Sequence, residues 1–314
     1  MKNVVEKSTL VSVQMLTYKH EAYIRQAIES VLMQKTDFEL DLIIADDCSP
    51  DKTPEIVNDV IRNNPKGYRI KYFRHEQNIG IQKNGLFALS KCKGKYIAIC
   101  EGDDYWTDPY KLQKQVDLME KNPSYNISFH LAKIINEYNS QVTFTEKYNE
   151  DETIIPVEII IKSNGGFMPT SSIMLRKIAI DNFLNFQNQS PGLPIGDYFL
   201  MVLGAIPDGA IYFPDTCSVY RKNSISSITN ILSKTKGRLN FCKKMLIAYN
   251  DLDNFTKKKY SSFLNKRKFH FLKWNINFFM RRLKFYRALV LVLYFLKNQK
   301  NPNENSSYCT QISS

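Results

Sequence analysis

The sequence has few of the residues that build disulfide frameworks and zinc sites. Its 314 residues include six cysteines and four histidines, no two cysteines form a C-x-x-C pair, and the histidines are scattered along the chain. A disulfide-rich secreted domain or a structural zinc module would show paired or regularly spaced ligands. The cysteines are therefore expected to be thiols in a reducing compartment.

Long apolar runs and glycine-rich phosphate loops are also missing. The first apolar segment, residues 10–16, contains Ser12 and Gln14, and is too short and too polar for the core of a signal peptide. No run reaches the roughly 18 apolar residues of a membrane-spanning helix. The chain has no G-x-x-x-x-G-K-[ST] loop, and no G-x-G-x-x-G follows its first predicted strand. These absences predict a cytoplasmic protein that holds any nucleotide phosphates by other means.

Charge is abundant and unevenly placed. The net charge is +12, from 43 Lys and Arg against 31 Asp and Glu. Residues 231–300 hold 18 basic residues and only two acidic ones, whereas the rest of the chain holds 25 basic and 29 acidic residues. The basic character therefore belongs to one C-terminal segment, where it needs an explanation.

Strand and helix patterns alternate through the first 130 residues. Strands are predicted over 10–16, 40–45, 70–73, 96–100 and 126–130, with amphipathic helices between them. Thr53-Pro54 and Asp108-Pro109 are predicted helix starts, with Thr53 and Asp108 as N-caps. Two later strands are expected over 210–213 and 217–220. Repeated alternation favours an α/β fold with a mostly parallel sheet flanked by helices.

Three polar clusters follow three of the predicted strands, at residues 17–18, 46–47 and 102–104. Ligands of such sheets bind outside the carboxyl ends of the strands, so the clusters are expected to meet at one edge. The adjacent carboxylates of Asp103 and Asp104 repel each other. A hard cation such as Mg²⁺, held by one or two carboxylates and by substrate phosphates, would offset this repulsion. Tyr18 can stack on a base, and Asp47 can accept a hydrogen bond from one.

Four segments of the chain, in this order, resemble the successive blocks of family 2 glycosyltransferases. They are VSVQMLTYKHEAYIRQAIESVLMQ, LDLIIADDCSPDKT, NIGIQKNGLFAL and GKYIAICEGDDYWTDPYKLQKQVDLM. The resemblance covers roughly residues 8–130 and continues more weakly to about residue 225. It implies the GT-A fold, a nucleotide-sugar donor, an inverting reaction and a divalent cation, Mg²⁺ or Mn²⁺.

The resemblance also implies roles for residues on the donor side. Tyr18 and Asp47 would contact the nucleoside, Asp103 would contact the ribose or the diphosphate, and Asp104 would bind the metal directly. The N-x-G…N block of the family supplies further candidates near the donor, which are Asn78, Gly80 and Asn84.

On the acceptor side, Gly196-Asp197 resembles the pair that opens a helix and supplies the general base. Many relatives carry a His in the loop after a Tyr-Arg strand end. The corresponding stretch here, Tyr220 to Ser224, has none. This departure puts in doubt a donor or metal contact expected at that position.

The predicted organisation has three parts. Residues 1–230 form the catalytic domain, with a nucleotide-sugar half over about 8–130 and an acceptor half over 131–230. Residues 231–300 form a basic, aromatic, helical extension, and the polar tail 301–314 is expected to be disordered. The extension can lie on an anionic membrane surface, or it can pack on the catalytic domain with a solvated basic face. No nucleic acid is expected as a partner, because no DNA- or RNA-reading motif accompanies the charge.

The sequence therefore predicts a metal-dependent inverting glycosyltransferase of the hexosyl- or hexosaminyltransferase class. It would move a sugar, with UDP-sugars favoured, to a glycan or lipid-linked acceptor in polysaccharide biosynthesis, at the cytoplasmic face of a membrane. Two alternatives stay open, a catalytically silent nucleotide-sugar-binding or scaffold module and a sugar nucleotidyltransferase. The second is less favoured, since it needs a glycine-rich loop directly after the first strand.

Overall fold

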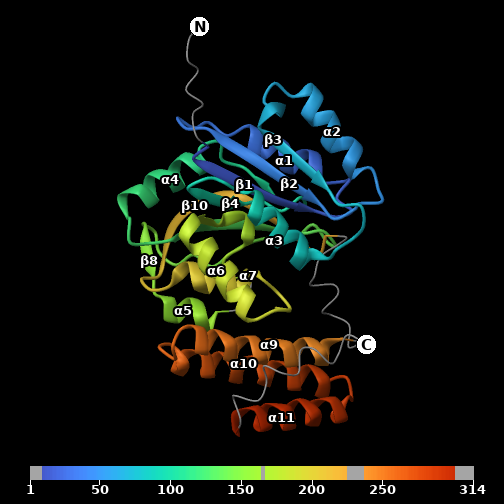
Figure 1. Ribbon diagram of the computed structural model, residues 1–314, viewed down its shortest axis with the longest axis vertical. Helices are drawn as coiled ribbons and strands as arrows, with labels where there is room; N and C mark the ends of the chain where they lie inside the picture. The colour runs from blue at the N-terminus through green and yellow to red at the C-terminus, as the bar shows by residue number, and fades with distance from the viewer. Residues whose placement is uncertain (1–8, 164–166, 225–236, 301–314) are drawn as a thin grey trace. The chain divides into compact units, whose positions relative to one another are not determined.

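The computed structural model describes residues 9–163, 167–224 and 237–300, without the side chains of residues 298–300. In these ranges ten strands form one sheet, in the order β3-β2-β1-β4-β9-β6-β10-β5, with β7 paired to β6 and β8 paired to β10 (Figure 1). The strands are β1 (Val11–Thr17), β2 (Leu40–Asp46), β3 (Ile70–Arg74), β4 (Tyr96–Ile99), β5 (Tyr105–Trp106), β6 (Ile127–Asn136), β7 (Val142–Phe144), β8 (Thr153–Ile155), β9 (Met174–Arg176) and β10 (Ala210–Lys222).

The first half of the sheet is parallel. β1 pairs with β2 and β4, and β2 pairs with β3, all in parallel register. β6 and β10 form a further parallel pair, whereas β5, β7, β8 and β9 add antiparallel pairs. The predicted α/β fold, with a mixed and mostly parallel sheet flanked by helices, is confirmed.

Helices cover both faces of the parallel half. Val11, Val13 and Met15 of β1 point into one apolar core together with α1 (Ile24–Leu32), α2 (Thr53–Asn63) and α4 (Lys111–Lys121). Gln14 points to the other face, where its side-chain amide donates to the carbonyl of Gly85 in α3 (Ile81–Lys91) at 3.1 Å. The remaining elements of the first 224 residues are η1 (Gly67–Arg69), α5 (Val157–Lys162), η2 (Thr170–Ser172), α6 (Lys177–Gln189) and α7 (Asp197–Ala205).

Three predicted boundaries are wrong in detail. α2 begins at Thr53 with Lys52 as its N-cap, because the Asp51 carboxylate takes the Thr53 N–H at 3.1 Å. α4 begins only at Lys111, since Asp108 forms a turn by accepting the Tyr110 N–H at 2.8 Å. The two strands expected over 210–213 and 217–220 are one strand, β10, whose pairing with β6 is interrupted by irregularities between residues 213 and 218.

The chain divides into two compact units, residues 1–184 with 196–227 and residues 185–195 with 228–314. The second unit contains α9 (Arg238–Phe255), α10 (Ser261–Met280) and α11 (Phe285–Lys300), which confirms the predicted helical extension. Buried polar contacts join these helices, such as the Arg238 Nε donating to the Asn275 Oδ1 at 2.9 Å. Residues 231–236 and the predicted disordered tail 301–314 lie outside the described residues. None of the described helices combines the length and apolar composition that crossing a membrane requires.

A buried lysine at the start of α4 packs against β5. Lys111 is fully buried, its ammonium lies 4.0 Å from the ring centre of Trp106, and it donates to Gln115 Oε1 at 2.7 Å. Gln115 in turn donates to the Ser172 carbonyl at 3.0 Å, and the Trp106 indole N–H donates to the Ser171 carbonyl at 2.8 Å. Burial lowers the pKa of Lys111 to about 7, because the charged ammonium loses its hydration.

Replacing this ammonium by a methionine of similar length should change how stability depends on pH. The unfolded lysine keeps its proton up to a pKa of about 10.4. The folded protein binds fewer protons than the unfolded chain between pH 7 and 10, so the stability of the wild type should rise over that range. Lys111→Met should lack this rise, and its stability relative to wild type should fall by about 2–3 kcal/mol from pH 7 to pH 9, at about 1.4 kcal/mol per pH unit. Urea unfolding of both proteins at pH 7 and pH 9 measures this change in relative stability.

The matched control is Lys121→Met, which removes an exposed lysine at the end of the same helix. A pH dependence of Lys111→Met identical to that of wild type and control would show that Lys111 keeps an ordinary pKa in the folded protein.

Candidate functional site

The carboxyl ends of β1, β2 and β4 meet at one edge of the sheet. Thr17, the last residue of β1, pairs with Asp46, the last residue of β2. Beyond the strands, the Asp47 N–H donates to the Thr17 carbonyl at 3.0 Å, and the Gly102 N–H donates to the Leu16 carbonyl at 2.9 Å. The predicted convergence of the three polar clusters is confirmed.

Asp104 lies buried at this edge. Its Oδ1 accepts the backbone N–H of Arg221 at 2.8 Å, so the end of β10 is tied to the turn after β4. Burial raises the pKa of the Asp104 carboxyl well above its usual range, and the charge of Asp103 raises it further. The Arg221 N–H, the Ser171 hydroxyl and the charge of Arg221 offset this effect in part. The carboxylate form of Asp104 is therefore short of compensating positive charge.

Asp103 is held by residues from the end of β10. The Ser224 hydroxyl donates to Asp103 Oδ2 at 2.5 Å, and the Arg221 guanidinium donates to the Asp103 backbone carbonyl at 2.7 Å. Ser224 lies in the stretch where the family resemblance leads one to expect a histidine. Here a serine hydroxyl contacts the acidic motif instead.

His20 packs against the acidic turn that contains Gly102 and Asp103. The ring is buried, and its Nε2 lies 4.0 Å from Asp103 Oδ2. Burial lowers the pKa of His20 more than the neighbouring carboxylates raise it, so the ring is neutral near pH 7. Gly102 is required here, because a Cβ at this position would lie 2.7 Å from the His20 Nδ1.

Arg221 is a residue whose role the sequence did not reveal. Its guanidinium forms an ion pair with Glu137 (Nε to Oε1, 3.2 Å) and donates to the Gln26 side chain. It also lies 5.0 Å from the ring centre of Tyr23 and 4.6 Å from that of Tyr105. Its position after a strand-end tyrosine was the only signal in the sequence. These contacts direct the guanidinium toward Glu137 and aromatic rings, and its hydrogen bond to the acidic turn is to the Asp103 backbone carbonyl. The charge of Arg221 also lowers the pKa of Asp104, but by less than burial and the charge of Asp103 raise it.

Asp197 is the first residue of α7, after the N-cap Gly196. Its side chain is exposed to solvent, yet protein surrounds it closely enough that desolvation raises the pKa of its carboxyl. The pKa of Glu101 lies well above its usual range because of burial and because the charges of Asp103, Asp197 and Asp104 act on it. Asp197 therefore belongs electrostatically with Glu101, Asp103 and Asp104, and we call these four residues the acidic cluster.

Asp47 holds a neighbouring loop in place. Its Oδ1 accepts the N–H of Ile79 at 2.7 Å, its Oδ2 accepts the N–H of Gly80 at 3.0 Å, and its backbone carbonyl accepts the Asn78 side-chain amide at 3.1 Å. Gly80 has a φ of 85°, which glycine adopts without strain. Each carboxylate oxygen of Asp47 keeps one lone pair for a ligand, so its nucleoside contact stays a prediction.

Asn84 and Tyr18 differ in how accessible their side chains are to a nucleotide-sugar donor. Asn84 is buried in α3, where its side-chain amide donates to the Ala45 carbonyl at 2.9 Å and its Oδ1 lies 3.0 Å from His75 Nε2. The structure thus gives Asn84 internal partners, and a direct donor contact stays a prediction. Tyr18 is half-buried beside Lys19, whose ammonium lies 5.2 Å from the tyrosine ring centre. Stacking of Tyr18 on a base likewise stays a prediction.

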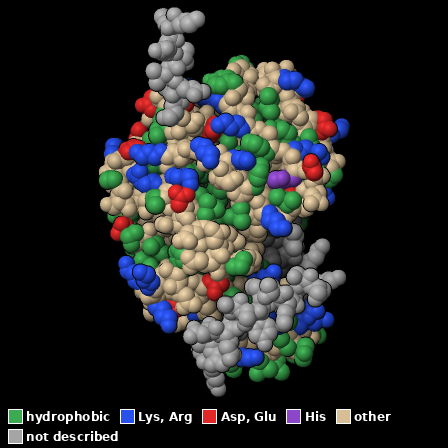
Figure 2. Space-filling model, in the orientation of Figure 1, with side chains coloured by type: hydrophobic (Ala, Val, Ile, Leu, Met, Phe, Trp, Pro, Cys, Tyr) green, Lys and Arg blue, Asp and Glu red, His purple; other side chains and the backbone are tan. Residues whose placement is uncertain are grey.

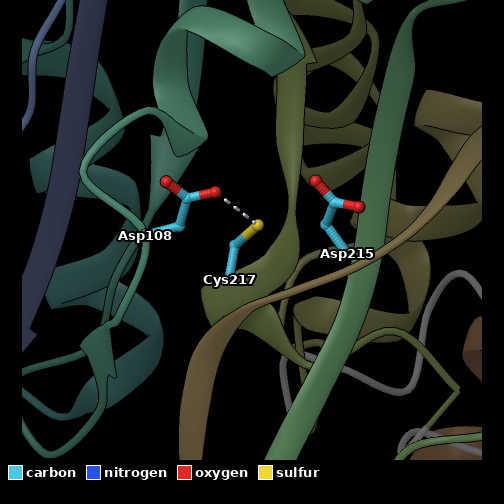
Figure 3. A group of neighbouring side chains, drawn as sticks. All are labelled: Asp108, Asp215 and Cys217. Atoms are coloured by element: carbon cyan, nitrogen blue, oxygen red, sulfur yellow. Dashed lines mark hydrogen bonds between the residues drawn. The ribbon is translucent and has the colours of Figure 1, made fainter.

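Another acidic group is separate from the cluster. The ligand atoms of Asp108, Asp215 and Cys217 lie within 4.8 Å of one another, and Figure 3 shows the Cys217 thiol between the two carboxylates. The thiol donates to Asp108 Oδ2 at 3.5 Å. The ammonium of Lys114 already bridges both carboxylates, at 2.7 Å from Asp108 and 2.6 Å from Asp215. This group is therefore compensated by a lysine.

The acidic cluster suits a hard divalent cation better. Its donors are carboxylate oxygens, which are the preferred ligands of Mg²⁺ and Mn²⁺. Three of its members have pKa values raised by desolvation or by one another's charge, and this is the environment in which a cation is favoured. Asp104 has one oxygen bound to the Arg221 N–H, and its second oxygen is the candidate metal ligand.

Comparison with known proteins identifies the family. Residues 12–183, more than half of the chain, match the family described as glycosyl transferase family 2. The chain belongs to this family. A protein of Mycobacterium tuberculosis that carries no assigned activity is 32% identical over 213 residues, which cover 68% of this chain and 59% of that protein. The chain thus spans about three fifths of the length of this relative.

Particular relatives carry more detailed names. The Escherichia coli enzyme WfaP, a UDP-Glc:α-D-GlcNAc-diphosphoundecaprenol β-1,3-glucosyltransferase, is 34% identical over 111 residues, covering 35% of this chain and 41% of WfaP. Among solved structures, Staphylococcus aureus TarS 1–349 in complex with UDP-GlcNAc has a TM-score of 0.63 at 17% identity, covering 92% of both chains. The mannosyltransferase PcManGT of Pyrobaculum calidifontis, in complex with GDP-Man and Mn²⁺, has a TM-score of 0.53 at 12% identity, covering 93% of this chain and 75% of that one. These structures establish a GT-A-like fold.

The charge imbalance of the acidic cluster should make the metal-free protein lose stability as pH rises. Asp104 has a higher pKa folded than unfolded, so the folded protein binds more protons once the pH exceeds the unfolded value of about 4. That contribution is present at low pH and lost as pH rises through the folded pKa. Asp104→Asn keeps an oxygen for the Arg221 N–H and removes the charge. In EDTA the stability of the variant relative to wild type should therefore increase from pH 5 to pH 8, because the variant lacks the carboxylate whose charged form burial disfavours.

Urea unfolding at the two pH values measures this gain, and Asp151→Asn, in an exposed loop, is the control. A pH dependence of Asp104→Asn equal to that of wild type would mean that Asp104 is already compensated in the metal-free protein.

The Asp47 contacts predict a structural effect of a different kind. Asp47→Ala should lower the free energy of unfolding by about 2 kcal/mol, because the N–H groups of Ile79 and Gly80 lose a charged acceptor. Asp47→Asn should lose about half as much, since one side-chain oxygen remains. Urea unfolding without ligand measures both, with Asp37→Ala as an exposed control. Unchanged stability of Asp47→Ala would show that the loop does not depend on this carboxylate.

Proposed function

We propose that the protein is an inverting glycosyltransferase that moves a hexosyl or hexosaminyl group from a nucleotide sugar to an acceptor hydroxyl. UDP-sugars are the favoured donors, and a glycan or a lipid-linked sugar is the favoured acceptor. The observation that carries this proposal is the acidic cluster, in which the candidate general base, Asp197, lies within electrostatic reach of the Glu101 that precedes Asp103 and Asp104.

Asp197 accepts the proton of the acceptor hydroxyl as that oxygen attacks the anomeric carbon. One displacement inverts the configuration, and no covalent nucleophile is needed. A positioned base typically contributes about 10²–10⁴-fold to the rate. The raised pKa of Asp197 brings its basicity closer to neutral pH, where a general base is most effective. Because only the carboxylate can accept the proton, turnover should rise with pH through the pKa of Asp197 and then level off.

The donor lies on the β1–β2–β4 edge. Tyr18 stacks on the base, Asp47 accepts a hydrogen bond from it, and Asp103 faces the ribose and diphosphate. Asp104 would hold Mg²⁺ or Mn²⁺ through a carboxylate oxygen. When bound, the cation neutralises charge on the diphosphate as it leaves. Asn78 and Asn84 position the loop and helix beside the donor, the first through the Asp47 carbonyl and the second through the Ala45 carbonyl.

Relatives support the choice of donor, acceptor and cation. The UDP-glucose and diphosphoundecaprenol in the name of WfaP support a UDP-sugar donor and a lipid-linked acceptor in polysaccharide synthesis. UDP-GlcNAc on TarS and Mn²⁺ on PcManGT support the nucleotide and the metal. The five described cysteines are thiols, which supports a cytoplasmic location.

The test measures release of nucleoside diphosphate from a panel of UDP- and GDP-sugars, with Mn²⁺, Mg²⁺ or EDTA. The enzymes are wild type, Asp104→Asn, Asp197→Asn and the control Asp37→Asn. We expect slow, metal-dependent release from one donor, and a loss of at least 10²-fold in Asp197→Asn, as expected for a general base. Calorimetric titration with UDP and Mn²⁺ should show binding to Asp197→Asn near the wild-type level and weakened binding to Asp104→Asn.

Binding of UDP without turnover, even with a panel of lipid-linked acceptors, would instead establish the silent binding module. Formation of a nucleotide sugar from a nucleoside triphosphate and a sugar phosphate would establish a nucleotidyltransferase. The absence of both UDP binding and turnover would overturn the proposal.

A further inference from the structure

The outer face of the C-terminal helix α11 carries an apolar stripe. Phe285, Leu289, Leu293 and Leu296 are 54%, 56%, 56% and 52% exposed. Their spacing of four, four and three residues places them on one side of the helix. We call these four residues the α11 stripe.

The packing of the second unit leaves the α11 stripe unexplained. The inner face of α11 is formed by residues such as Ala288 and Leu291, which are 4% and 0% exposed. A surface helix normally has a polar outer face opposite such a core-facing side. Because α11 is apolar on both faces, its outer face indicates a surface that contacts something other than water.

The turn between α10 and α11 extends this apolar surface and adds charge. Leu283 is 75% exposed and has a φ of 52°, a left-handed conformation that bulky residues rarely adopt. It is flanked by the exposed cations Arg281, Arg282 and Lys284. From residue 254 to residue 300 the sequence contains no Asp or Glu. At the lower end of Figure 2, where Figure 1 places α11, hydrophobic side chains lie beside Lys and Arg.

We propose that α11 and the α10–α11 turn lie in the surface of a membrane that contains anionic lipid. Apolar side chains of an interfacial helix enter the boundary between headgroups and acyl chains, while Lys and Arg interact with anionic headgroups. The α11 stripe and residues 281–284 meet both requirements. At about 1.5 Å per residue, the 16 residues of α11 span about 24 Å, less than the roughly 30 Å hydrocarbon core of a bilayer. This agrees with the finding that none of the described helices is built to cross a membrane.

Other partners fit the same surface less well. A second copy of the chain, paired through this face, would bring the two sets of cations at 281–284 together, and like charges oppose such an interface. A nucleic acid would satisfy the cations but would leave the leucines of the stripe against a polar, charged backbone. An anionic bilayer accommodates both the charge and the apolar side chains.

The test is sedimentation of the full chain with vesicles, either of phosphatidylcholine alone or with 30% phosphatidylglycerol. Wild type should bind the anionic vesicles, and binding should weaken as NaCl rises from 0.1 to 0.5 M. Leu289→Ser/Leu293→Ser should weaken binding at least tenfold. Arg281→Gln/Lys284→Gln should weaken it about 10- to 30-fold, since each cation near an anionic surface contributes several-fold.

Matched controls separate these effects from general changes in surface composition. Val142→Ser/Phe144→Ser removes two exposed apolar side chains of β7, and Lys52→Gln/Lys121→Gln removes two exposed lysines of the first unit. Both controls should bind vesicles like wild type. All variants should retain the wild-type unfolding midpoint.

Several results would overturn the proposal. They are equal binding to neutral and anionic vesicles, stripe variants that bind like wild type, and absence of vesicle binding. Light scattering that shows a dimer lost in Leu289→Ser/Leu293→Ser, without vesicle binding, would assign the face to a second copy. Donor hydrolysis in solution should be unaffected by these variants, so failure of the membrane proposal is distinguishable from failure of the proposed activity.

Discussion

The site depends on a concentration of carboxylates that the fold holds partly out of water. The pKa values of Glu101, Asp104 and Asp197 are all raised, mainly because burial removes hydration from the charged form. The sheet enforces this arrangement, since the hydrogen bonds between the ends of β1, β2 and β4 hold the acidic turn after β4 in place. A ligand that brings positive charge to this site would therefore stabilise the folded protein as it binds. The proposed cation site would link cation binding to the folding stability of the first unit.

Arg221 shows how the fold keeps this site acidic although a permanent cation lies beside it. Its guanidinium is committed to Glu137, Gln26 and two aromatic rings, and it reaches the acidic turn only at the backbone carbonyl of Asp103. The turn is thereby anchored to β10, and the charge of Arg221 offsets only part of the rise in the pKa of Asp104. Lys114 does the opposite for the group at Asp108, Asp215 and Cys217, because it bridges both carboxylates there. The contrast explains why a cation is expected at one acidic group and not at the other.

Under the membrane proposal, the second unit would bind a different negatively charged partner by different means. Its cations lie among apolar side chains. Residues 254–300 contain no Asp or Glu with which these cations could pair. A diphosphate needs a small, dry site in which a metal can bridge carboxylate and phosphate, whereas a lipid surface is broad and wet and is met by a broad face. If both proposals hold, the first unit recognises the soluble donor and the second brings the protein to the surface on which lipid-linked acceptors are found.

The sequence by itself determined the alternation of strands and helices, the edge at which Tyr18, Asp47 and Asp104 meet, and the family, because these follow from local periodicity and from the rule that parallel strands end together. It did not determine where α2 and α4 begin, since Asp51 and Asp108 form turns that compete with capping. The roles of Arg221, Asp47 and Ser224 were decided by the tertiary structure. Their contacts join segments up to 121 positions apart, a distance at which no local pattern carries a signal. The same holds for α11, because a helix that is apolar on both faces does not reveal from its sequence which face the protein buries and which it leaves exposed.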